Sequence, residues 1–384
     1  MSDDTANSRD EERRGGRQQE SWSGRLYGVP ALARGARRAG GASGGERDRA
    51  ATGGRMIMAS AVAVAADARE GRGENSSAAY LTLADGRRLR YRVFGDADGQ
   101  AVLALHGTPG SHLKFASAAE EARRLGLTLV SVDRWGYGES DAPPRARLAA
   151  YADDMAALMT ALGHRRFAVL GISGGGPFAV AVAAGLPSRV TALALVAPVG
   201  EIARRVESAS GSALNPFHAF CFLGLARVPI VVRLLFLAFR GILAISPTGA
   251  IRIATARACA SDRAIMRDRD AARQLARTFS DGLRGLAPGP ALDLALFRRA
   301  WDFDLGAAVC PARVWIGTAD RNVPQAVARH LARRLAHGTL ATPTGAGHYW
   351  IIGHTDEVLA WLAEAIARGT AAREDPAAQD GAMR

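Results

Sequence analysis

The sequence predicts an α/β protein built on a mostly parallel, doubly wound sheet. From residue 77 onward, short apolar runs alternate with stretches of helical character, which is the pattern of a parallel sheet covered by helices. The runs are apolar throughout rather than alternately polar, as expected of strands buried on both faces. Asp85-Gly86 separates two further strand-like runs and predicts a hairpin at the start of the sheet.

The expected elements follow in chain order. The hairpin pairs residues 80–84 with residues 89–94. Four buried strands come next, at residues 101–106, 127–133, 167–172 and 192–197. Helices are expected between them, at residues 115–125, 149–162 and 175–184. After a long segment without strand character, at 199–301, the alternation resumes with a strand at 313–317, a helix at 324–335, a strand at 339–342 and a helix at 357–367.

The two ends of the chain differ in composition from this core. Residues 1–76 are rich in Gly, Ser, Arg and Ala and have few periodic apolar patterns, so they cannot bury enough surface to offset the entropy lost on ordering. We therefore expect a disordered N-terminal extension at 1–76, a folded domain at 77–369 and a flexible tail at 370–384. The arginines of the extension are nearly balanced by acidic residues, which disfavours a nucleic-acid-binding arm.

Two features bear on the cellular compartment. An apolar run at residues 56–66 resembles the core of a secretory signal but lies far from Met1. Export is therefore expected only if translation starts near Met56, and the cytoplasm is expected otherwise. The three cysteines, Cys221, Cys259 and Cys310, lie far apart and form no zinc-binding pattern. They fit buried, reduced thiols, with a disulfide between two of them left open.

The charge is concentrated in one part of the chain. The 49 basic and 37 acidic residues give a net charge of +12, and only one of the basic residues is a lysine, Lys114. Residues 201–300 hold 15 arginines against 7 acidic residues. No groove-reading motif accompanies this charge, so a nucleic-acid partner is not expected. The charge favours attraction of anionic small molecules or peripheral contact with an anionic membrane. The apolar stretch at 217–245 contains three arginines, which disfavours a membrane-spanning helix.

The strongest chemical motif is Gly171-Ile172-Ser173-Gly174-Gly175. It stands directly after a predicted strand and directly before a predicted helix, which is the context that a Gly-x-Ser-x-Gly nucleophile turn requires. Such a turn holds the serine in a strained backbone conformation with its hydroxyl exposed. The positions two before and two after the serine must be small, and both are glycine. Ser173 is therefore the candidate nucleophile.

A serine hydroxyl needs a base, and the base needs a carboxylate that orients it. In this architecture the chain order is serine, acid, histidine. Asp320 and His348 follow predicted strands in that order, and we expect them at the edge of the sheet where α/β sites form. Asp302, Asp304 and His354 are weaker candidates for the same roles, because their positions fit less well.

The reaction of such a serine also needs hydrogen-bond donors for an oxyanion. His106-Gly107-Thr108-Pro109-Gly110 follows the first buried strand, and its glycines let backbone N–H groups approach a ligand. The expected donors are the backbone N–H groups of Thr108 and Gly174, since Pro109 has no N–H. We interpret His106 as structural.

Together these motifs resemble the α/β-hydrolase-fold superfamily. They occur in the family's order and cover about residues 77–369. The matching stretches are His106-Gly107-Thr108-Pro109-Gly110, Asp133-Arg134-Trp135-Gly136-Tyr137-Gly138-Glu139-Ser140, Gly171-Ile172-Ser173-Gly174-Gly175, Asp320 and Gly347-His348. The resemblance implies the α/β-hydrolase fold, with Ser173 as nucleophile, His348 as base and Asp320 as its partner. It also implies a helical cap, at about 200–301, inserted after the sixth strand.

The resemblance implies a serine hydrolase. Related haloalkane dehalogenases and epoxide hydrolases carry an aspartate where this chain has Ser173. We expect cleavage of a carboxylic ester in a small, hydrophobic substrate, with an acidic group favoured by the basic cap. Two alternatives stay open: hydrolysis of a carbon–carbon bond or acyl transfer on the same triad, and a non-catalytic, ligand-binding member of the fold. No metal or organic cofactor is implied.

Overall fold

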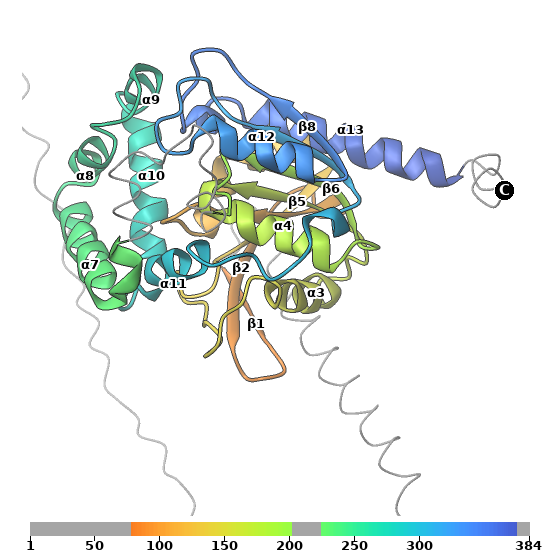
Figure 1. The fold of residues 1–384 in the computed structure, drawn as a ribbon, viewed down its shortest axis with the longest axis horizontal. Coiled ribbons are helices and arrows are strands. Elements are labelled where there is room, and N and C mark those ends of the chain that lie inside the picture. The colour runs from red at the N-terminus through yellow and green to blue at the C-terminus, as the bar shows by residue number, and fades with distance from the viewer. Residues whose placement is uncertain (1–77, 202–223, 375–384) are drawn as a thin grey trace, which may run out of the picture. The chain divides into compact units, whose positions relative to one another are not determined.

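The computed structural model describes residues 78–201 and 224–374, and it contains an eight-stranded sheet flanked by helices (Figure 1). The strands are β1 (Ala79–Thr82), β2 (Arg88–Gly95), β3 (Gln100–Leu105), β4 (Leu127–Val132), β5 (Phe167–Ile172), β6 (Val190–Val196), β7 (Pro311–Trp315) and β8 (His337–Ala341). Their order across the sheet is β1-β2-β4-β3-β5-β6-β7-β8. β2 pairs antiparallel with β1 and β4, whereas all neighbours from β4 to β8 are parallel. The predicted α/β class with a mostly parallel sheet is confirmed.

Both faces of the sheet are covered, as a parallel sheet requires. Every residue of β4 and β5 is buried. One face packs against α3 (Tyr151–Ala161), α4 (Gly176–Gly185) and α12 (Gln325–Arg334). The other packs against α2 (Ala119–Arg124) and α13 (Thr355–Glu374). Because β3, β5, β6 and β7 run in the same direction, their carboxyl ends lie at one edge of the sheet, where the loops that follow them meet.

The predicted elements agree closely with the structure. Each strand overlaps its predicted range, with boundaries that shift by no more than two residues. The helix predicted at 115–125 begins earlier, as the 3₁₀ helix η1 (His112–Ala118), and continues as α2. The Ser111 side chain accepts a hydrogen bond from the N–H of Leu113 and caps η1, which explains the earlier start.

The tail predicted at 370–384 is wrong for its first residues, because α13 continues to Glu374. The sequence predicted that the last helix ends at residue 367. Near this end the Thr370 hydroxyl donates to the carbonyl of Ile366, and Arg368 pairs with Glu364 on the same helix. Residues 375–384, the extension at 1–76 and Cys221 lie outside the described residues. Cys259 and Cys310 are buried free thiols.

A group of helices connects β6 to β7, at the position predicted for the cap. Within the described residues these are α7 (Pro229–Ile245), α8 (Pro247–Ala254), α9 (Ala260–Ile265), α10 (Arg269–Gly282) and α11 (Pro288–Phe297), and we call α7–α11 the cap. They pack on one another around a small apolar core that includes Leu243, Ile251, Leu275 and Phe279. Figure 1 shows them together at one end of the sheet.

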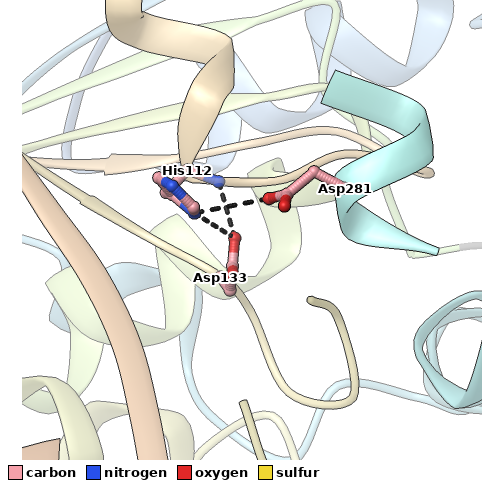
Figure 2. Close-up of side chains that lie close together, drawn as sticks. All are labelled: His112, Asp133 and Asp281. Carbon is pink, nitrogen blue, oxygen red and sulfur yellow. Dashed lines mark hydrogen bonds and ion pairs between the residues drawn. The ribbon is translucent and has the colours of Figure 1, made fainter. Parts of the chain in front are cut away.

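Charged side chains tie the cap to the sheet. Figure 2 shows Asp281 of α10 beside His112 of η1 and Asp133, which follows β4. His112 Nδ1 lies 3.0 Å from Asp133 Oδ1 and 3.7 Å from Asp281 Oδ2. Arg90 of β2 places Nη1 3.3 Å from Asp281 and 3.6 Å from Asp133. His112, Asp133 and Asp281 are buried and Arg90 is largely buried, so water screens the charges that hold the cap to the core only weakly.

The outer face of α7 carries exposed apolar side chains. Ile230 and Leu234 are more than half exposed, and Ile245 is 87% exposed. Clustered exposure of large apolar side chains is typical of contact surfaces. None of the helices in the described ranges has the length and apolar character needed to cross a bilayer. Peripheral contact with an anionic membrane stays a prediction.

Candidate active site

The Gly-x-Ser-x-Gly motif forms a sharp turn between β5 and α4. Ser173 has φ of 51°, in the left-handed region that residues other than glycine rarely adopt. A Cβ on Gly171 would lie 2.6 Å from the Cβ of Ala179, and a Cβ on Gly175 would lie 2.5 Å from the carbonyl oxygen of Leu105. Only glycine fits at either position. The turn therefore holds Ser173 at the carboxyl end of a buried central strand.

Ser173, His348 and Asp320 form a chain of hydrogen bonds. His348 Nε2 lies 3.1 Å from Ser173 Oγ, and His348 Nδ1 lies 2.9 Å from Asp320 Oδ2. Asp320 comes from the loop after β7, and its other oxygen accepts hydrogen bonds from the N–H groups of Asn322 at 2.7 Å and Val323 at 2.9 Å. These bonds fix the orientation of the carboxylate. The structure thus brings together the three residues that the sequence singled out.

The environment of His348 favours its protonated form. Burial alone would lower the pKa of this imidazole, but the charge and hydrogen bond of Asp320 and the charge of Asp262 outweigh it and raise the pKa above 6.5. The positive charge of Lys114 acts in the opposite direction. An imidazole with these neighbours can accept a proton from Ser173 and hold it as a stabilised cation.

The loop after β3 lies against the serine turn. A Cβ on Gly107 would lie 3.2 Å from the Cβ of Ser173, and a Cβ on Gly174 would lie 3.3 Å from the backbone nitrogen of Thr108. The two predicted oxyanion donors, Thr108 and Gly174, are therefore neighbours beside Ser173. Backbone N–H groups in such a position can stabilise negative charge that develops on a reacting carbonyl oxygen.

A buried ion pair from the cap holds this loop in place. Asp293 of α11 is fully buried, and its carboxylate binds both terminal nitrogens of Arg134 at 2.7 and 2.8 Å. The Thr108 hydroxyl donates to the same carboxylate, as does the Tyr137 hydroxyl at 2.6 Å. Arg134 also donates to the carbonyl of Gly107 at 3.1 Å. Asp293 therefore connects the cap to the backbone that carries Thr108.

A second cap carboxylate holds the histidine loop. Asp262 of α9 is buried and accepts hydrogen bonds from the N–H groups of His348 at 2.9 Å and Tyr349 at 2.8 Å. A Cβ on Gly347 would lie only 2.3 Å from that carboxylate, so glycine is needed there. Sequence reasoning missed both Asp262 and Asp293, because neither belongs to a recognisable motif.

The weaker candidates lie elsewhere. Asp302 binds Arg147 and the N–H of Ala149, and Asp304 caps a 3₁₀ helix by accepting from the N–H of Gly306. His354 stacks on the ring of Trp350. None of the three joins the hydrogen-bonded chain at Ser173.

His106 is structural, as predicted. Its Nδ1 lies 2.8 Å from the carbonyl of Gly107, and its Nε2 accepts from the N–H of Arg134 at 3.1 Å. Burial, together with the charge of Arg134, holds the pKa of His106 well below 6.5, so the imidazole stays neutral.

Ser173 lines an apolar cavity of about 630 Å³. The cap supplies much of its wall, through apolar side chains of α7, α10 and α11 that include Phe236, Phe239, Phe279 and Phe297. Backbone and polar groups gather at one part of the cavity, around Ser173, His348 and the loop after β3. The cavity suits a mostly apolar ligand with its reactive group at Ser173.

The cluster in Figure 2 also has the side-chain types of a metal site, since ligand atoms of His112, Asp133 and Asp281 lie within 4.8 Å of one another. Its hydrogen bonds argue for an ion-pair cluster instead. His112 Nδ1 faces a carboxylate and therefore carries a proton, and the guanidinium of Arg90 supplies the counter-charge. We therefore interpret the cluster as the anchor of the cap.

Comparison with known proteins identifies the fold. The sequence model of the alpha/beta hydrolase fold matches residues 100–227. A non-heme chloroperoxidase from Streptomyces lividans is 36% identical over 121 residues, which are 31% of this chain and 44% of that protein. Lipase 1 from Psychrobacter immobilis is 35% identical over 123 residues, which are 31% of this chain and 38% of that protein. The chain thus spans less than half the length of these curated relatives.

Solved structures extend the likeness over most of the chain. An alpha/beta hydrolase fold protein from Nakamurella multipartita is similar with a TM-score of 0.56 and 26% sequence identity, over 76% of this chain and 99% of that one. The sheet order, the serine turn and these comparisons agree on one fold, the α/β-hydrolase fold with helices inserted between β6 and β7.

The buried ion pair gives a stability prediction. Replacement of Asp293 by Asn leaves the charge of Arg134 buried without its partner, so the free energy of unfolding should fall by about 3–5 kcal/mol. Urea denaturation measures this. Asp270→Asn is the matched control, because the Asp270 side chain is 93% exposed in its pair with Arg273 and should change stability by less than about 0.5 kcal/mol. Equal stability of the two variants would contradict the role given to Asp293.

The imidazole of His348 gives a titration prediction. NMR of the wild type, with the signal assigned from a His348→Gln variant, should show a pKa above 6.5. Asp320→Asn removes the counter-charge while the burial remains, so the pKa of His348 should fall. A pKa that does not change in Asp320→Asn would show that this carboxylate does not govern the imidazole.

Proposed function

We propose that this chain, which belongs to the α/β-hydrolase-fold superfamily, is a serine hydrolase that cleaves carboxylic esters of small, largely apolar substrates. One observation carries the proposal. Hydrogen bonds link Ser173 through His348 to Asp320, and Ser173 and His348 line an apolar cavity. Each member has the chemistry that the reaction needs, and each is held by contacts of its own.

The proposed reaction begins when Ser173 Oγ attacks the ester carbonyl. His348 Nε2 takes the hydroxyl proton, and the Asp320 carboxylate stabilises the imidazolium that results. The carbonyl oxygen becomes an oxyanion beside the N–H groups of Thr108 and Gly174, and each such donor contributes about 2.7–4 kcal/mol to lowering the barrier.

Collapse of this intermediate expels the alcohol, which takes the proton from His348 and leaves an acyl group on Ser173. Water then attacks the acyl-enzyme with His348 again as base. The acid is released, and the free serine is restored.

The alternatives share the same residues. Hydrolysis of a carbon–carbon bond, or transfer of the acyl group to an acceptor other than water, would use Ser173, His348 and Asp320 in the same roles. Product analysis separates them, since ester hydrolysis yields one acid and one alcohol, whereas acyl transfer consumes an added acceptor. A non-catalytic, ligand-binding protein would need none of the hydrogen bonds between these three side chains, which makes it the weaker proposal.

A panel of 4-nitrophenyl esters with acyl chains of increasing length tests the proposal. The wild type should hydrolyse them with a clear preference for some chain lengths, and Ser173→Ala should lower kcat/KM by roughly 10⁴-fold or more. Ser280→Ala, on α10 outside the cavity lining, should match the wild type. Equal, flat activity in the wild type and Ser173→Ala would overturn the assignment.

A further inference from the structure

Lys114 faces the same cavity as Ser173 and His348, and it is the only lysine of the chain. It belongs to η1, which begins two residues after the loop that carries Thr108. Its positive charge acts on the imidazole of His348, where it lowers the pKa. A single ligand in this cavity could therefore contact Lys114 and Ser173 at the same time.

The ammonium group of Lys114 has no partner among the described residues. No hydrogen bond or ion pair of this side chain is found there, and no aspartate or glutamate lines the described part of the cavity. The rest of the described lining is largely apolar and includes Leu235 and Phe239 of α7 and Leu275 of α10. Lys114 is partly buried. A cation that is shielded from water without a counter-charge is unfavourable, so the cavity is complementary to an anion.

The arginines of the cap do not serve this purpose. No arginine lines the described part of the cavity, and the arginines of α10 at positions 269, 273 and 277 are exposed. The arginines of the cap can therefore attract anions from a distance, and Lys114 is the only lysine or arginine in the described lining of the cavity.

We propose that Lys114 binds a carboxylate of the substrate, so that the esters cleaved at Ser173 carry one negative charge away from the scissile bond. This inference rests on the proposed function. A carboxylate suits the site better than a phosphate because one ammonium balances one charge, whereas a phosphate dianion would leave excess charge against the apolar wall. The apolar surface between the two groups would contact the linking carbon chain.

The protonation state of Lys114 agrees with this role. Burial lowers the pKa of the ammonium to about 8, so the group is mostly charged at neutral pH and loses its charge just above it. Among the described residues that line the cavity, the other titratable groups are His106, His348 and Tyr349. Burial raises the pKa of Tyr349 far above this range, and His106 stays neutral.

Two matched substrates test the proposal: mono-4-nitrophenyl glutarate, which carries a free carboxylate, and its neutral methyl ester, with the succinate and adipate homologues to vary the spacing. The readout is the ratio of kcat/KM for the anionic ester to that for the neutral ester. Lys114→Met should lower this ratio roughly 10- to 100-fold, since a charge-assisted hydrogen bond is lost, and Lys114→Arg should restore part of it. Arg277→Met, an exposed cap cation, should leave the ratio at its wild-type value.

The outcomes separate this inference from the proposed function. If the wild type cleaves neither ester and Ser173→Ala behaves in the same way, the proposed function fails. If the wild type cleaves both esters and the ratio is unchanged in Lys114→Met at every chain length, Lys114 does not bind the carboxylate. A ratio that falls equally in Arg277→Met would indicate long-range attraction by the cap and would also overturn the inference.

A measurement on the wild type covers the case in which Lys114→Met does not fold. The ratio should fall as the pH rises from 7 to 9, because the ammonium that holds the carboxylate is lost near pH 8. Titration of His348 changes kcat/KM for both esters by the same factor, so it cancels in the ratio of the two values. A ratio that stays constant over this range would contradict a role for Lys114.

Discussion

The backbone conformation of Ser173 is the constraint on which the site depends. A residue with a side chain adopts φ of 51° only when its surroundings hold it there, and here glycines on both sides let α4 and the end of β3 approach to contact distance. That close approach brings the loop carrying Thr108 next to Gly174 and turns the hydroxyl of Ser173 toward His348. The packing of the central strands is therefore what fixes the positions of Ser173 and its neighbours.

The cap contributes to the site in two ways. Its apolar side chains form much of the cavity wall, and its buried carboxylates hold the loops of the core. Asp293 binds Arg134 and Thr108, and Asp262 binds the backbone at His348. Both loops would lose a fixed support if the cap moved, so cap position and site geometry are coupled. A buried carboxylate that satisfies several donors at once provides such coupling, because removing it leaves a buried charge or buried donors without a partner.

The sequence predicted the sheet and singled out five candidate site residues because short motifs carry them. Ser173 and Gly174 lie in one turn, and Thr108, Asp320 and His348 follow strand ends that periodicity locates. Asp262, Asp293 and the placement of Lys114 could not be predicted, since they depend on how cap helices pack against loops far away in the chain. The end of α13 was predicted at residue 367, whereas the helix continues to Glu374, and the Thr370 hydroxyl donates to the carbonyl of Ile366 within it.

The central claim is that Ser173 is a nucleophile activated by its neighbours, and covalent labelling tests it most directly. The protein is treated with a fluorophosphonate, and its intact mass and peptides are then measured by mass spectrometry. The account predicts one adduct per chain, on the peptide that contains Ser173, and none in Ser173→Ala. An unlabelled wild type, or labelling of equal extent in Ser173→Ala, would contradict it.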